Sequence, residues 1–167
     1  ITSAKSTVGA AGLMQLMPQT AELMKKKMDL SLVNEANAAT VSAGEADPML
    51  NVALGQDYVE HLLENNLVEG NLLYLLAAYN AGPGRLKQWK DTLEFGGDPL
   101  LFVESIPYGE TRHYVMQVMT NYWIYSELTG HSNGSVLALL KGQWPDYYKH
   151  AAPVAYGSIQ SIIGNAG

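Results

Sequence analysis

The sequence predicts an all-α protein in which several helices pack around one buried helix. Apolar residues recur at intervals of three and four through several segments, and strand signals are sparse. The segment NLLYLLAAY, residues 71–79, is apolar nearly all round, which is typical of a helix in the centre of a domain. A chain of 167 residues is long enough to bury a substantial core, and a single domain is the default expectation.

The first predicted helix begins at Pro18, because a proline at the first helical position lacks only an N–H that has no partner there. The segment PQTAELMKKKM, residues 18–28, places three apolar side chains on one face: Ala21, Met24 and Met28. The lysines Lys25–Lys27 are interpreted as a solvated last turn that the helix dipole favours. Residues 30–46 have no clear period, which predicts a loop or short broken helices.

A second helix is expected to start at Asp47 and Pro48, after which apolar residues fall at helical intervals. Gly55 lies inside it and indicates close packing at that point. The apolar helix of residues 71–79 then ends at NAGPG, where glycine permits a left-handed turn and Pro83 prevents continuation.

Residues 98–106 predict one short helix. Residues 110–128 predict a long one that carries four side chains on a common face: Tyr114, Val118, Tyr122 and Tyr125. Further along, the segment SVLALLKG predicts another short helix, and the final residues 151–167 are small, neutral and expected to be mobile.

The composition excludes several classes of function. A net charge of −6, with only ten lysines and arginines, leaves no basic stripe, so we expect no nucleic-acid partner. No apolar stretch is long enough for a transmembrane segment. The absence of cysteine removes disulfides, thiolate metal sites and cysteine nucleophiles. Because the histidines are scattered, we expect no metal site; they are His61, His113, His131 and His150. We also expect no cofactor.

The motif GAAGLMQLMP precedes the first helix and holds two glycines three residues apart. We interpret these glycines as a structural turn, because the lysine and hydroxyl residue of a phosphate-binding loop are missing. Gln15 and Met17 leave two interpretations open. The amide of Gln15 must find polar partners, and either a core or an open groove that holds a sugar supplies them.

Two further motifs contain candidate site residues. In AAYNAGPGR, Tyr79 and Asn80 lie where a helix meets a loop, and a hydroxyl beside an amide is suited to holding a carbohydrate. In FVESIPYGETRHYV, Glu110 is better explained as a first-turn residue that satisfies the helix N-terminus, pairing with Arg112 or another base, than as a catalyst. Glu104 lies outside any clear capping position and stays a site candidate.

In this order and spacing, these motifs resemble the lytic transglycosylase domain of the soluble lytic murein transglycosylases, which is related to goose-type lysozyme. The resemblance rests on Ser6 with GAAGLMQLMPQTA, the segment from Asp47 to Tyr58, LAAYNAGPGRLKQW and FVESIPYGETRHYV. It implies a lysozyme-like multi-helix domain over residues 1–130 that lacks its N-terminal helix, and a C-terminal extension over residues 131–167.

The resemblance also implies an activity, namely cleavage of the β-1,4 bond between N-acetylmuramic acid and N-acetylglucosamine in peptidoglycan with formation of a 1,6-anhydro end. In the family, the glutamate of a Glu-Ser pair serves as both acid and base. The family's spacing puts this glutamate a few residues before Ile1, so we expect the visible sequence to be a processed or truncated piece. The family works at the cell envelope, usually in the periplasm, with peptidoglycan strands as its partner.

The same resemblance assigns roles to individual residues. Ser6 is expected to assist at the acetamido group or the 6-hydroxyl of the sugar. The residues expected to line the glycan groove are Gln15, Met17, Tyr79, Asn80, Glu104 and Tyr114. Two alternatives remain: a non-catalytic peptidoglycan-binding or envelope-scaffold module, and a hydrolytic lysozyme-like muramidase.

Overall fold

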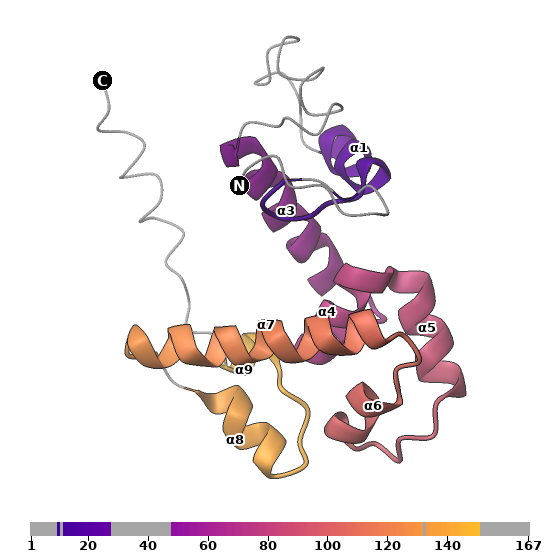
Figure 1. Ribbon diagram of the computed structural model, residues 1–167, viewed down its shortest axis with the longest axis vertical. Helices are drawn as coiled ribbons and strands as arrows, with labels where there is room; N and C mark the ends of the chain where they lie inside the picture. The colour runs from indigo at the N-terminus through magenta and orange to yellow at the C-terminus, as the bar shows by residue number, and fades with distance from the viewer. Residues whose placement is uncertain (1–9, 11, 28–47, 132, 151–167) are drawn as a thin grey trace. The chain divides into compact units, whose positions relative to one another are not determined.

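The computed structural model describes residues 10, 12–27, 48–131 and 133–150 (Figure 1). Within these ranges the chain is helical, and pairing of extended backbone occurs as isolated bridges, such as that between Asn71 and Asp146, and not as strands. The predicted all-α fold class is therefore confirmed. The predictions for residues 30–46, for residues 151–167 and for the side chains of the lysine run lie outside the described residues.

The chain divides into two compact units, residues 1–64 and residues 65–167. The first unit contains α1, Pro18–Lys27, and α3, Pro48–Leu63, which contact each other. Both helices begin at the prolines that the sequence indicated. Three apolar side chains of these helices are almost completely buried: Met24, Leu54 and Leu62.

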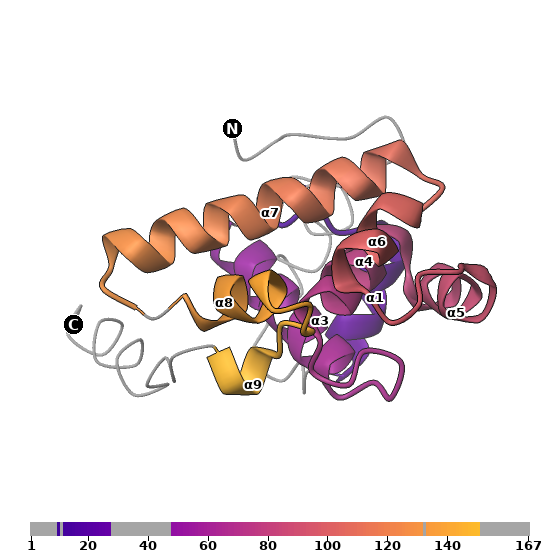
Figure 2. The same ribbon diagram turned by 90° about the horizontal axis from the view of Figure 1, so that it is seen from below.

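The second unit is arranged around α4, Leu72–Ala81, which contacts both α5, Pro83–Thr92, and α7, Gly109–Leu128. Six of the ten residues of α4 are buried, as expected for the apolar segment. Asn71 is the N-cap of α4: its side-chain oxygen accepts hydrogen bonds from the backbone N–H groups of Leu73 at 2.9 Å and Tyr74 at 3.2 Å. In Figures 1 and 2, α7 is the long helix that runs beside α4.

Helix α5, Pro83–Thr92, was not predicted from the sequence, which indicated only that the preceding helix ends here. Gly82, with φ of +88°, ends α4 and directly precedes α5. Pro83 cannot continue α4, but its fixed φ and missing N–H suit the first position of a new helix. A single glycine therefore redirects the chain from one helix into the next.

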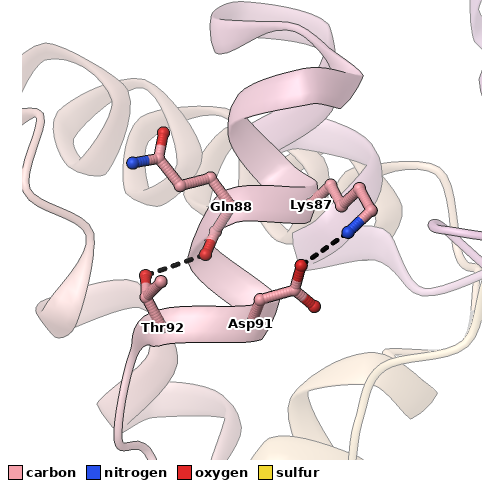
Figure 3. A network of polar contacts seen from close by, with 4 residues as sticks. All are labelled: Lys87, Gln88, Asp91 and Thr92. Carbon is pink, nitrogen blue, oxygen red and sulfur yellow. Dashed lines mark hydrogen bonds and ion pairs between the residues drawn. The ribbon is translucent and has the colours of Figure 1, made fainter.

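The outer face of α5 carries a small polar network (Figure 3). The Lys87 Nζ lies 2.6 Å from Asp91 Oδ2, and the Thr92 hydroxyl donates a hydrogen bond of 2.8 Å to the Gln88 carbonyl. An exposed ion pair of this kind contributes about 0.3–0.5 kcal/mol. The buried side chains of α5, Leu86 among them, therefore hold the helix in place more than this network does.

The remaining helices of the described chain are α6, Pro99–Ser105; α8, Gly134–Leu140; and α9, Tyr147–His150. The predicted helices at 98–106, 110–128 and in SVLALLKG are confirmed, while α9 was not predicted. Aromatic rings from α4, α6 and two loops of the second unit pack against one another, with centroid separations of 4.7 to 6.0 Å. They belong to Tyr74, Phe95, Phe102 and Trp144.

The buried face of α7 is displaced from the stripe of four side chains that the sequence singled out. Tyr125, the last member of that stripe, is 67% exposed. The buried side chains lie one position away, on the neighbouring stripe of the helix: Thr111, Val115, Met119 and Ser126. The tyrosines made the first stripe conspicuous, but helix packing buries the face that carries the smaller and more flexible side chains.

Candidate functional site

In the first unit, the GLMQ segment forms a tight turn that is fastened to α3. The Gln15 N–H donates a hydrogen bond of 3.3 Å to the Gly12 carbonyl and closes the turn. The Met14 N–H donates to Asn51 Oδ1 at 2.7 Å, and Asn51 is only 6% exposed. A buried amide of α3 therefore fixes the position of the turn.

Glycine is required at two points of this arrangement. Gly12 has φ of +78°, and a Cβ added there would lie 2.6 Å from Asn51 Cγ. A Cβ added at Gly55 would lie 2.6 Å from Met14 Cε. These contacts support the structural interpretation of Gly12 and confirm the close packing predicted at Gly55.

Gln15 and Met17 both lie at the protein surface, so of the two interpretations left open by the sequence, burial in a core is wrong. Gln15 Nε2 donates a hydrogen bond of 2.7 Å to the Gly12 carbonyl. The backbone of Gln15 has φ of +49°, in a region that residues other than glycine rarely adopt. Such strain concentrates at functional sites, where the surrounding structure enforces it.

In the second unit, the structure brings together three of the predicted groove residues. The rings of Tyr79 on α4 and Tyr114 on α7 are stacked, with centroids 6.4 Å apart and an interplanar angle of 6°. The next residue of α4, Asn80, is exposed, and its Oδ1 accepts a hydrogen bond of 2.7 Å from the Thr111 hydroxyl. An aromatic pair and an amide therefore stand next to each other where α4 meets α7.

A third contact between the two motifs joins Arg85 to Tyr108. The guanidinium carbon of Arg85 lies 5.3 Å from the ring centroid of Tyr108, and the rings of Tyr108 and Trp89 are nearly perpendicular, with centroids 5.5 Å apart. As the residue number rises from 79 to 85, the number of the residue that it contacts falls from 114 to 108. The AAYNAGPGR and FVESIPYGETRHYV motifs therefore lie side by side in opposite chain directions.

Burial raises the pKa of the Tyr114 hydroxyl to about 12. The hydroxyl is therefore neutral throughout the physiological range and keeps its proton for donation. Tyr79 is half-buried. Half-buried aromatic rings with adjacent polar groups are suited to a ligand that has both apolar faces and hydroxyl or amide groups.

The acidic residues of the second motif are separated by the structure. Glu110 lies in the first turn of α7, where the helix dipole favours a carboxylate, as the sequence indicated. Arg112 instead donates from Nη1 to the carbonyl of Ile106. Glu104, in the last turn of α6, is exposed and makes no hydrogen bond or ion pair with any described residue, which leaves its carboxylate available to a ligand.

Ser6 lies outside the described residues, so its predicted role is not described by the structure. Sequence reasoning missed Thr111 and Asn51, the two buried polar residues that fasten the motifs to the helices. No periodicity distinguishes a polar residue that is buried from one that faces water. Within the described ranges, no helix has the length and apolarity of a membrane span, and no cluster of metal-ligating side chains is found.

Comparison with known proteins gives two family matches. The model of the transglycosylase SLT domain matches residues 2–98, and that of the soluble lytic transglycosylase helical domain matches residues 105–133. The soluble lytic murein transglycosylase of Escherichia coli strain K12 is 39% identical over 116 residues, which are 69% of this chain and 17% of that protein. The chain thus spans about a fifth of the length of its relatives.

Solved structures agree with this similarity. An inactive mutant of the lytic transglycosylase Slt from Pseudomonas aeruginosa matches 90% of this chain and 21% of its own, with a TM-score of 0.62 and 31% identity. A complex of the 70 kDa soluble lytic transglycosylase with bulgecin A matches 78% of this chain and 20% of its own, with a TM-score of 0.65 and 34% identity. The lysozyme-like fold that the resemblance implied is confirmed.

Proposed function

This chain belongs to the family of transglycosylase SLT domains, and on that premise we propose that it forms the glycan-binding part of a peptidoglycan lytic transglycosylase. The bond cleaved is the β-1,4 link between N-acetylmuramic acid and N-acetylglucosamine. A glutamic acid, proposed to precede Ile1, protonates the bridging oxygen as its bond to C1 breaks. The resulting carboxylate takes the proton of the muramic 6-hydroxyl while that oxygen bonds to C1, so a 1,6-anhydro end forms and no water is consumed.

The observation that carries the proposal is the Tyr79–Tyr114 stack beside the Asn80 amide. The C–H groups of a pyranose ring pack against an aromatic ring, while an amide recognises the acetamido group that both sugars of peptidoglycan carry. The neutral Tyr114 hydroxyl supplies a further donor. These groups bind and orient the sugar, and the proton transfers are assigned to the upstream glutamate.

The other site assignments belong to the same proposal. Gln15 and Met17, whose side chains are both exposed, supply glycan contacts from the turn after Gly12. The exposed Glu104 carboxylate accepts hydrogen bonds from sugar hydroxyls. Ser6 is proposed to assist at the acetamido group or the 6-hydroxyl.

The cellular setting is proposed from the same relatives, which are named for murein. We place the activity at the bacterial cell envelope, in the periplasm, with residues 1–130 as the transglycosylase domain and residues 131–167 as its extension. Because a relative forms a complex with bulgecin A, we also expect this chain to bind bulgecin A.

A binding experiment tests the first half of the proposal. The 167-residue protein is titrated with the disaccharide of N-acetylglucosamine and 1,6-anhydro-N-acetylmuramic acid, followed by calorimetry. We expect saturable binding that bulgecin A displaces. Lys87→Gln is the matched control, because Lys87 contacts Asp91 on the outer face of α5 and its loss should leave the affinity unchanged. Absence of binding by the unaltered protein would contradict the proposal.

A digestion experiment tests the chemistry. The protein extended at its amino end by the residues that precede Ile1 in the full-length chain is incubated with purified peptidoglycan, and the products are analysed by mass spectrometry. Anhydro ends support the lytic transglycosylase. Reducing ends, heavier by one water, would identify a hydrolytic muramidase, and binding without cleavage would identify a non-catalytic envelope module.

A further inference from the structure

Thr111 is a buried polar residue to which neither the sequence nor the family resemblance gave a role. Its side chain lies on the face of α7 that meets α4 and is only 2% exposed. Its hydroxyl donates a hydrogen bond of 2.7 Å to Asn80 Oδ1, across 31 residues of sequence. This side-chain hydrogen bond joins the AAYNAGPGR motif to the FVESIPYGETRHYV motif.

A hydrogen bond at this position decides which end of the Asn80 amide faces outward. The oxygen and nitrogen of an amide have nearly the same shape, so the surrounding hydrogen bonds determine the orientation of the group. The hydroxyl of Thr111 has a single hydrogen, and it is directed to Oδ1. Asn80 Nδ2 donates to no described residue, and because Asn80 is exposed, its two hydrogens are available to a ligand.

We propose that Thr111 is a positioning residue that presents the two Nδ2 hydrogens of Asn80 to an acceptor oxygen of the bound glycan. The inference rests on the proposed function, because the acceptor is the acetamido carbonyl or a hydroxyl of the sugar on the Tyr79–Tyr114 stack. A freely rotating asparagine would offer a donor and an acceptor in turn and would lose side-chain freedom on binding. An amide that is already oriented avoids this loss.

Three variants separate orientation from mere packing. Thr111→Val keeps the shape of the buried side chain and removes the hydroxyl, whereas Thr111→Ser restores the hydroxyl without the methyl group. Asn80→Asp keeps the oxygen that accepts from Thr111 and replaces both N–H donors with an acceptor. The readouts are the NMR order parameter of the Asn80 side-chain Nδ2 and the affinity for the anhydro disaccharide.

We expect the order parameter of Asn80 Nδ2 to fall below about 0.6 in Thr111→Val and to stay at the wild-type value in Thr111→Ser. The disaccharide affinity should fall about five- to tenfold in Thr111→Val and recover in Thr111→Ser. Asn80→Asp should lose at least about tenfold in affinity while its thermal midpoint is preserved, because the contact with Thr111 remains.

The possible failures are distinguishable. If the wild-type protein binds the disaccharide and Thr111→Val binds it equally well, the positioning role is overturned and the proposed function stands. If Thr111→Val and Thr111→Ser weaken binding alike, Thr111 acts by packing and the inference is overturned. If the wild-type protein binds no glycan, the proposed function fails, and the order parameter of the Asn80 amide alone decides whether Thr111 orients it.

Discussion

The rings of Tyr79 and Tyr114 lie parallel within 6°, with their centroids 6.4 Å apart, and this stack joins the end of α4 to the first half of α7. Each ring comes from a different sequence motif, so the two motifs meet in one aromatic surface. A stack of this kind holds both rings in a fixed orientation and therefore prepares the surface on which the glycan is proposed to lie.

The first prediction concerns the aromatic surface itself. Tyr79→Ala removes the ring and is expected to weaken binding of the anhydro disaccharide by about three- to tenfold, because the stacking contacts are lost. Tyr79→Phe keeps the ring and is expected to retain most of the affinity. Calorimetric titration of both variants checks the prediction, and equal losses in the two would assign the binding to the hydroxyl instead of the ring.

The second prediction is a loss of stability at alkaline pH. Burial raises the pKa of Tyr114 from 10.0 to about 12 in the folded protein, so between these values the unfolded chain binds fewer protons than the folded one. The stabilising contribution is complete below pH 10 and is lost as the pH rises towards 12. Burial, assisted by the charge of Glu69, raises the pKa of Tyr74 to about 12 in the same way.

Urea unfolding at about pH 9 and about pH 11 measures this effect. In Tyr114→Phe, the fall in the free energy of unfolding between the two pH values should be smaller than in the wild type, because the contribution of the Tyr114 hydroxyl is gone. Tyr125→Phe is the control, since Tyr125 is exposed, and it should follow the wild-type curve. Identical pH dependence in Tyr114→Phe and the wild type would contradict the prediction.

The third prediction compares two helix N-caps. Asn71, which is buried, caps α4, and Asp98, which is exposed, caps α6; each accepts two backbone N–H bonds. Asn71→Ala is expected to lower the free energy of unfolding by about 2 kcal/mol, because buried N–H groups lose their partner. Asp98→Ala should cost about 1 kcal/mol or less, since water replaces the lost acceptor. Chemical denaturation gives both values, and a larger loss for Asp98→Ala would contradict this ranking.

How far the sequence predicted the fold depends on how strongly each helix is periodic. Helices α3 and α7 repeat apolar residues at helical spacing; the start of α3 was predicted at Asp47 and Pro48, and α7 was predicted to within one residue at each end. Helix α5 was missed because PGRLKQWKDT is mostly polar and buries only Leu86 and Trp89. At the start of α5, the single residue Pro83 marks both the end of the preceding helix and the beginning of the next.

The candidate site was predictable as a set of residues but not as an arrangement. Tyr79, Asn80 and Tyr114 were each expected in a groove, yet no pattern indicated that the two rings stack. The hydrogen bond from Thr111 to Asn80 joins positions 31 residues apart, and a threonine within a helix carries no sequence signal for such a partner. Contacts of this range follow from the packing of helices and not from local propensity.

The last prediction concerns Gly55, against which Met14 packs. Alanine normally stabilises a helix by up to about 1 kcal/mol relative to glycine. At Gly55, however, the added Cβ would lie 2.5 Å from Met14 Cγ and 2.8 Å from Met14 Cβ, so the start of that side chain and not only its flexible end must move. Overpacking of this kind costs about 1–3 kcal/mol, and we expect Gly55→Ala to be destabilising.

Gly84 provides the matched comparison, because it also lies within a helix but an added Cβ there meets no atom within 4 Å. Gly84→Ala is therefore expected to leave the free energy of unfolding unchanged or to raise it by up to about 1 kcal/mol. In the double variant Gly55→Ala and Met14→Ala, the overlaps with Met14 Cγ and Cε are removed and only the 2.8 Å approach to Met14 Cβ remains, so Gly55→Ala should cost less in the Met14→Ala background than in the wild type. Additive costs in this double-mutant cycle would mean that the Met14 side chain beyond Cβ does not resist a larger residue at position 55 of α3.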